Sequence, residues 1–267
     1  MGKRRCIAII MALSALTLSA QTDSVTNHLS TYQIGLGPTR VLDTYLSQEK
    51  FSGVGMTFLN TLEIQKPDSR WTTMTQHQFN FSTVSDRSES RDELQGDYSL
   101  FIGRYHGWQL FNDRLLVQAG ALANLNIGFI YNTSNSNNPA QGRFSLNLMP
   151  SATATYPFQL FGKQWSARYE LDLPLVGVMF SPNYGQSYYE IFQLGNYEHN
   201  IVPTTFIATP NLRQQLSIEC SLWRNLTLRL GYLGEYQQAH VNNLKSHIYH
   251  HRIMIGVVRT LRVLDNK

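Results

Sequence analysis

Apolar and polar residues alternate with a period of two along much of this chain. Between Leu226 and Tyr236, leucines and tyrosines occupy one face, while Arg229 and Glu235 fall on the other, with Leu233 as an exception. The segments that alternate in the same way are 115–129, 144–156 and 165–173. This period predicts β-strands whose two faces meet different surroundings.

The length of these segments bears on the choice between water and lipid. A soluble β-sandwich also alternates, but its strands usually run about five or six residues. Tilted strands that cross a membrane need about nine to eleven residues. Several segments reach or exceed that length, and their polar faces carry charges at mid-strand. The pattern favours an all-β fold that forms a single antiparallel transmembrane β-barrel, with a soluble β protein as the alternative.

We expect about ten strands, within a range of about eight to twelve, as in small barrels of this kind. The expected strands are residues 32–46, 53–65, 72–85, 97–111, 115–131, 143–159, 164–179, 212–222, 226–236 and 248–261.

The predicted connections alternate between short and long after the third strand. Short turns are expected at 112–114, 161–163 and 224–225, and long polar links at 86–95, 132–142, 181–211 and 237–247. Barrels of the outer membrane have tight periplasmic turns and longer external loops. An even strand count then predicts that both termini lie on the periplasmic side.

The first residues read as a secretory signal. Lys3, Arg4 and Arg5 precede a short apolar stretch, and Ser19-Ala20 offers a small-residue cleavage site before Gln21. We therefore expect a signal peptide at residues 1–20 and one barrel domain at residues 21–267, exported to a bacterial outer membrane.

Removal of this segment changes the charge and the cysteine count. Of the 22 Lys and Arg residues three lie in the segment, which leaves 19 against 18 Asp and Glu, a net charge of +1. No basic stripe remains that could neutralise phosphates, so a nucleic-acid partner is not expected. Cys220 is the only cysteine left, which excludes an intrachain disulfide and disfavours a cysteine-based zinc site.

Several segments together resemble one known family. They are 41–47, 126–132, 138–141, 176–205, 241–245 and 254–256. In these segments the chain is similar to exported Bacteroidetes proteins grouped as a domain of unknown function, DUF3316. The resemblance implies a small, porin-like outer-membrane barrel, with membrane lipid and the barrel assembly machinery as partners. It implies no established activity, so no catalytic residue follows from it.

The inward faces of the later strands carry charges of both signs. The residues are Arg168, Glu170, Asp172, Arg213, Glu219, Arg229, Glu235 and Arg252. Side chains largely fill the interior of a narrow barrel, and unpaired buried charges are costly. We interpret these residues as a salt-bridge network that plugs the lumen, with a selective conduit for a small solute as the alternative.

The longest predicted loop is rich in tyrosine, asparagine and glycine. Its tyrosines are Tyr184, Tyr188, Tyr189 and Tyr197. Tyrosine and asparagine offer rigid contact area and hydrogen bonds, as in surfaces that bind glycans or other partners. This loop therefore either binds a small solute or glycan, or folds inward as a plug.

Catalysis is the weaker hypothesis. A barrel-embedded lipid hydrolase needs a Ser–His pair, and Ser246-His247, with His250 and His251 nearby, is the only local candidate. Adjacent strand residues point to opposite faces, which argues against a direct Ser246–His247 pair. The histidines also lack clustered carboxylate or cysteine partners. We therefore assign no catalytic residue, metal or cofactor, and keep a lipid-modifying hydrolase and a closed-lumen surface interaction protein as alternatives to a solute channel or binding barrel.

Overall fold

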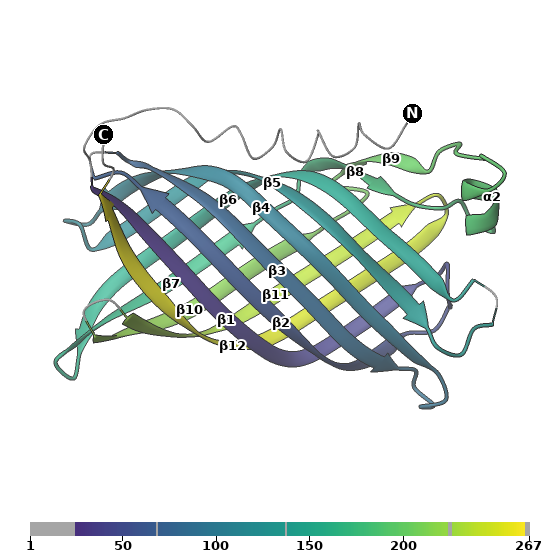
Figure 1. The fold of residues 1–267 in the computed structure, drawn as a ribbon, viewed down its shortest axis with the longest axis horizontal. Coiled ribbons are helices and arrows are strands. Elements are labelled where there is room, and N and C mark those ends of the chain that lie inside the picture. The colour runs from purple at the N-terminus through teal and green to yellow at the C-terminus, as the bar shows by residue number, and fades with distance from the viewer. Residues whose placement is uncertain (1–24, 68, 137, 224–225, 265–267) are drawn as a thin grey trace.

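The computed structural model describes residues 25–67, 69–136, 138–223 and 226–264, in which an antiparallel sheet closes into a barrel (Figure 1). The expected signal peptide, residues 1–20, lies outside the described residues. The strands are β1 (Val25–Asp43), β2 (Phe51–Gln65), β3 (Trp71–Ser85), β4 (Asp92–Leu110), β5 (Leu115–Asn132), β6 (Ala140–Leu160), β7 (Lys163–Asp172), β8 (Val176–Phe180), β9 (Ile201–Thr205), β10 (Leu212–Trp223), β11 (Leu226–Val241) and β12 (Leu244–Leu264).

Every described strand except β8 and β9 is part of one closed ring of ten. The ring follows chain order from β1 to β7 and continues through β10, β11 and β12. Pairing of β1 with β12, from Val25↔Leu264 to Asp43↔Ser246, closes it. The predicted single antiparallel barrel of about ten strands is confirmed.

The period-two pattern places polar side chains inside and apolar side chains outside. Along β3, for example, Gln76, Gln78 and Asn80 are buried in the lumen, while Phe79 and Phe81 are exposed on the outer surface. This is the reverse of a soluble protein and the arrangement of barrels whose outer band meets lipid.

The two ends of the barrel differ in their connections. The start of β1 and the end of β12 lie at the same end of the barrel, where tight connections join β4 to β5 and β6 to β7 (Figure 1). We call this the turn end. The opposite loop end carries the connections β1–β2, β3–β4 and β5–β6, and a longer segment that contains the helix α2 (Tyr188–Phe192). No helix among the described residues is long and apolar enough to span a bilayer.

One predicted loop is a pair of strands instead. Residues 237–247 were expected to form a long link, but β11 and β12 stay paired up to Val241↔Leu244. A two-residue turn joins them, in which Asn242 and Asn243 have φ of 52° and 59°, the left-handed conformation that tight hairpins require. The prediction was wrong because the outward face becomes polar beyond the apolar band, as at His240, while Ala239 and Val241 are buried, so the alternation of the membrane-spanning part is inverted.

One predicted strand is broken. The expected strand 164–179 is split into β7 and β8 at residues 173–175, where Pro174 cannot donate a ladder hydrogen bond. The ladder along β6 nevertheless continues, because Leu173 N donates to Pro150 O and Leu175 N to Leu148 O. Beyond the break, β8 pairs with β6 and β9 pairs with β8.

Candidate functional site: a plugged lumen below a vestibule

Side chains join opposite walls of the barrel directly. β2 and β7 are separated by four strands in either direction around the ring, as are β3 and β10. Arg168 on β7 nevertheless contacts Glu63 on β2 at 2.6 Å. Arg213 on β10 donates to Gln76 at 2.7 Å and to Gln78 at 3.2 Å, both on β3. These contacts cross the full width of the lumen.

The structure places the predicted lumen charges in several groups of contacts. Arg213 contacts Glu170 at 2.8 Å and Asp172 at 2.6 Å, and Arg168 lies 3.6 Å from Glu170. Arg229 pairs with Glu219 on the neighbouring strand. All these side chains are buried or nearly so, so each charge needs its partner to remain in the lumen.

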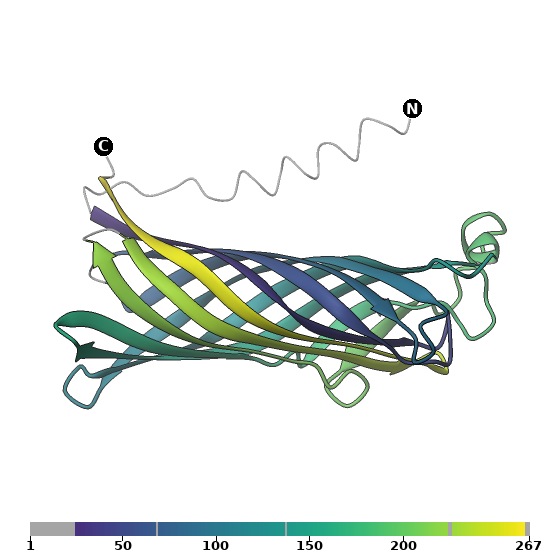
Figure 2. The same ribbon diagram turned by 90° about the horizontal axis from the view of Figure 1, so that it is seen from below.

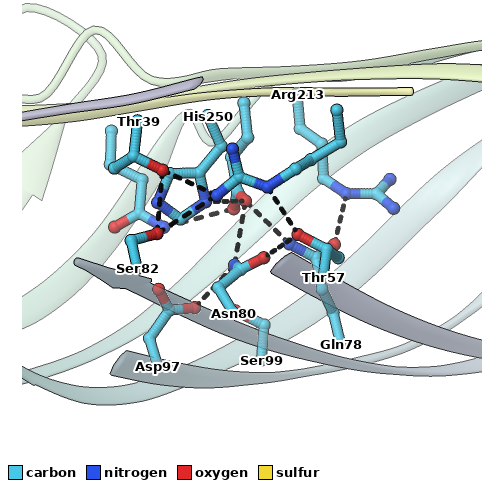
Figure 3. Close-up of polar contacts among 12 residues, drawn as sticks. Thr39, Thr57, Gln78, Asn80, Ser82, Asp97, Ser99, Arg213 and His250 are labelled. Atoms are coloured by element: carbon cyan, nitrogen blue, oxygen red, sulfur yellow. Dashed lines mark hydrogen bonds and ion pairs between the residues drawn. The ribbon is translucent and has the colours of Figure 1, made fainter. Parts of the chain in front are cut away.

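Glu235 and Arg252 occupy a second group, in which neutral side chains provide most of the contacts. Figure 3 labels several of these neutral partners, among them Thr39, Gln78 and Asn80. Glu235 accepts from Gln78 at 2.7 Å and from Asn80 at 3.3 Å. Asn80 also donates to Asp97, so one amide bridges two carboxylates. Arg252 is fully buried, and hydroxyl and carbonyl oxygens hold it. Its hydrogen-bond acceptors are Gly37, Pro38, Thr39, Thr57, Ser82 and His251.

Apolar side chains fill the space between these groups. One inward cluster joins β3 to β6 and consists of Met74, Phe101, Tyr105, Leu122 and Met149. Another joins β2, β11 and β12 and consists of Leu59, Leu233 and Met254. The guanidinium of Arg213 lies over the ring of Phe101, 4.9 Å from its centroid, which ties the apolar and charged parts together.

Towards the loop end, a cavity lies above this plug, with about 950 Å³ of space free of protein atoms when the open solvent at its mouth is included. It lies against the walls formed by β5, β6, β8, β10 and β11. On the other side of the barrel, a third apolar cluster of Val41, Phe51, Val84, Ile130 and Ile248 fills the interior. We call the cavity the vestibule. Its amide side chains come from Asn124, Asn126, Gln141, Asn147, Asn211, Gln237 and Gln238.

The charges that line the vestibule are balanced. They are Asp43, Arg143, Arg213 and Glu235, two of each sign. Arg143 lies 3.8 Å from Asp43, and Arg213 is held by the carboxylates of the plug. The vestibule thus presents amides, hydroxyls and apolar surface, with charges of the two signs in equal number.

The long loop covers part of the loop end through α2. Ser187 and Glu190 form a reciprocal capping box at the start of this helix, and Ile191 is buried beneath it. The Tyr188 hydroxyl donates to Gln141 Oε1 and accepts from Gly142 N, which fixes the helix to β6. Burial raises the pKa of Tyr188 to about 12, so the hydroxyl stays protonated.

The four loop tyrosines therefore divide into two groups. Tyr188 packs edge-on against Tyr45 with ring centroids 5.8 Å apart, in a structural position. Tyr184, Tyr189 and Tyr197 are exposed and available to a partner. The structure does not gather these three tyrosines around the vestibule, because none of them lines it.

The serine and histidines considered for catalysis do not come together. Ser246 lines the vestibule, whereas His247, the next residue on β12, stacks on Tyr249 with ring centroids 4.6 Å apart. His250 is buried in the lumen next to Glu235. His251 Nδ1 forms a 2.6 Å hydrogen bond with the Tyr232 hydroxyl. Across the described chain, no three His, Cys, Asp or Glu side chains form a group that could hold a metal ion.

Sequence reasoning missed several residues of this interior. Glu63, Asp97, Gln76, Gln78 and Asn80 lie on early strands that were not searched for charge partners, although their period-two positions are inward. The apolar clusters had a visible signal. Leu122 and Leu233 interrupt the alternation in the sequence, and each is fully buried in one of the inward clusters.

Comparison with solved structures finds other barrels at very low identity. Neisserial surface protein A is 9% identical, with a TM-score of 0.39, and 88% of this chain and 97% of that chain are covered. The outer-membrane protease OmpT from Escherichia coli is 8% identical, with a TM-score of 0.45 and coverage of 92% and 99%. The transport unit of the Escherichia coli autotransporter AIDA-I is 11% identical, with a TM-score of 0.43 and coverage of 96% and 97%. These likenesses are too distant to carry an argument about function.

Comparison of the sequence with curated proteins found no match. Comparison with family profiles gives a firmer result. The profile of one family, described as "Protein of unknown function (DUF3316)", matches residues 6–267, nearly the whole chain. The chain therefore belongs to the DUF3316 family, as its loop segments had indicated.

Proposed function

We propose that this protein is an outer-membrane barrel with a sealed lumen, and that it binds a small, neutral, polar ligand in the vestibule. The observation that carries the proposal is the contrast along one lumen. Arg168–Glu63 and the Arg213–glutamine contacts join opposite walls, while a cavity that is open to solvent lies above them.

The outer-membrane location is supported by the distribution of polarity on the barrel wall. Side chains such as Phe58, Ile102, Leu148 and Ile218 are exposed on the outside, where water would penalise them. A closed barrel also satisfies its backbone hydrogen bonds without an edge, as hydrocarbon surroundings demand. The expected export signal and assembly machinery belong to the same proposal.

The ligand class follows from the chemistry of the vestibule wall. Seven amide side chains supply both donors and acceptors, and the four charges of the wall are two of each sign. An ionic ligand would find charges of both signs in equal number, whereas a saccharide would find many hydrogen-bond donors and acceptors. We therefore propose a neutral saccharide or a similar polyhydroxy compound.

The seal is tested by single-channel recording of the refolded mature protein in a planar bilayer. We expect a folded, heat-modifiable barrel that conducts no ions in discrete steps. Regular steps from the unmodified protein would instead support a solute channel and contradict the sealed lumen.

Ligand binding is tested by isothermal titration calorimetry with a panel of neutral sugars, such as glucose, galactose, N-acetylglucosamine and maltose. Ser145 points into the vestibule from β6, and Ser145→Trp should fill the space and abolish binding. Ser145→Ala keeps the space open and is the matched control. If Ser145→Trp binds a sugar as well as the unmodified protein does, the vestibule is not the site.

A further inference from the structure

The barrel wall beside the vestibule lacks a continuous strand ladder. Among the described strands, β9 pairs with β8 alone. β10 pairs with β11 only up to Leu212↔Tyr236, so the last residues of β11, from Gln237 to Val241, have β12 on one side and no strand on the other. Between β9 and the end of β11 the wall is therefore interrupted.

The segment 206–211 fills this interruption through few contacts. His240 N donates to Ala208 O at 3.1 Å. Gln238 N donates to Asn211 Oδ1 at 2.5 Å, and Gln238 Nε2 to Pro210 O at 3.1 Å. In two of these three bonds one partner is a side chain, that of Asn211 in the first and that of Gln238 in the second. Along the same stretch a backbone ladder holds β11 to β12.

The segment projects from the barrel wall as the small green loop below the ribbon in Figure 2, apart from the green loop that carries α2. Its exposed side chains are apolar. Ile207 at its tip is 93% exposed, and Phe206 beside it is also exposed. Phe206 N donates to Leu175 O, and Leu175 N donates to Leu148 O, so only the stretch around Leu175 lies between the segment and the exposed apolar run of β6. The tip therefore continues the surface that we assign to lipid.

The inner side of the same segment belongs to the vestibule. Thr209 and Asn211 line the cavity, together with the neighbouring Leu212. The cavity also has an apolar portion, to which Phe101, Met149 and Met179 contribute. One short segment thus separates a cavity with polar and apolar walls from the apolar outer surface.

We infer that the segment 206–211 is a lateral gate between the vestibule and the outer leaflet, and that the ligand is an amphiphile with a neutral, sugar-like head group and an alkyl chain. The head group meets the amides of the vestibule, and the chain passes beneath the segment into the bilayer. This inference rests on the proposed function, because it takes the vestibule as the binding site. It adds the route and the second half of the ligand.

The experiment locks the gate and asks whether a lipid chain still enters. Ala208→Cys and His240→Cys are combined with Cys220→Ser, so that oxidation joins the segment to β11 and reduction releases it. The four tryptophans are replaced by phenylalanine, and Met179→Trp places one indole on the vestibule wall. The probe is a dialkyl glucoside with a nitroxide on one chain, in phosphatidylcholine vesicles, and its quenching of the indole is measured.

In the reduced protein we expect stronger quenching by the labelled glucoside than by phosphatidylcholine labelled at the same chain position. In the oxidised protein this excess should disappear, while titration with soluble glucose or maltose should still show binding. The same sample serves as its own folding control, because reduction restores the gate.

Two results would overturn the inference and are distinguishable. Equal quenching in the oxidised and reduced states, with soluble sugar still bound, rejects the lateral gate but leaves the proposed function intact. Absence of both excess quenching and sugar binding in the reduced protein rejects the proposed function as well.

A second variant tests the position of the tip independently. Ile207→Asp should impair membrane insertion more than Tyr197→Asp does, and equal insertion would contradict contact with acyl chains.

Discussion

The two halves of the lumen belong to one closed barrel but have different interiors. Towards the turn end, Arg168 and Arg213 reach across the full width and contact Glu63, Gln76 and Gln78. Towards the loop end, Arg143 finds its carboxylate partner, Asp43, within the rim of the vestibule. Long side chains of opposite charge close the first half. In the second half, shorter amide side chains line the vestibule and leave it open.

This difference teaches that strand number alone does not decide whether a small barrel is open. In a narrow barrel, the length and pairing of the inward side chains set the free space. The two halves should also differ in energetic sensitivity. Substitutions in the plug should act on stability, and substitutions in the vestibule should act on binding.

The largest effect is expected at Arg213. Replacement by leucine leaves Glu170 and Asp172 buried without their shared cation, and breaking a buried pair in this way costs about 3–5 kcal/mol. Urea unfolding in lipid vesicles, followed by the shift in heat-modifiable mobility, measures the loss. Arg114→Leu, at an exposed turn, is the matched control and should change stability by less than about 0.5 kcal/mol. Equal losses would mean that the plug contributes nothing to stability.

A smaller loss is expected from the apolar part of the plug. Leu122→Ala opens a cavity among fully buried side chains and should cost about 2–5 kcal/mol. Leu146→Ala removes the same atoms from the outer surface, where acyl chains refill the space, so its cost should be clearly lower. The same unfolding assay compares the two variants. A larger cost at Leu146 would contradict the assignment of the inner and outer faces.

The barrel itself was predictable because one physical signal, the period of two, repeats over many residues. Strand positions follow from it closely, as with residues 53–65 predicted and Phe51–Gln65 observed. The signal fails where the surroundings of the wall change. Beyond the apolar band the outward face of β11 becomes polar while Ala239 and Val241 are buried, so the end of this strand lacks the pattern that predicts a membrane strand. At Pro174 the break is local, and the alternation continues past it.

The interior was predictable in composition but not in pairing. The sequence identified Arg168, Arg213 and Glu170 as inward residues, yet their partners depend on the closure of the ring. Which strands face each other across a lumen is fixed by strand count and stagger, which no local pattern contains. Glu63 is more than a hundred residues from Arg168, and only the closed barrel brings them together. The vestibule was missed for the same reason, because it is a space and not a motif.

A substitution in the vestibule should lower ligand affinity, whereas substitutions in the plug lower stability. Asn147 donates to Asn124 and Ser145, and Asn147→Ala removes one of the amides that we assign to the ligand. One lost hydrogen bond of about 1 kcal/mol lowers affinity by about fivefold. Titration calorimetry with the sugar that binds best measures this change. Gln109→Ala, an exposed amide near the turn end, should leave affinity unchanged, and an equal loss there would argue against specific recognition.

The last prediction concerns the hairpin turn between β11 and β12 and the difference in cleavage rate between two variants of it. Asn242 and Asn243 both have positive φ, so alanine at either position carries a similar backbone cost of about 1–2 kcal/mol. Asn242 alone also donates its amide to Ser181 O at 3.1 Å and to His199 O at 2.8 Å, which holds both ends of the α2 loop. Asn242→Ala should therefore speed cleavage of that loop in limited proteolysis, while Asn243→Ala should not. Because the backbone cost is shared, the difference between the two variants isolates the contribution of the side chain. Equal cleavage would mean that packing beneath Ile191, and not Asn242, keeps the loop over the barrel.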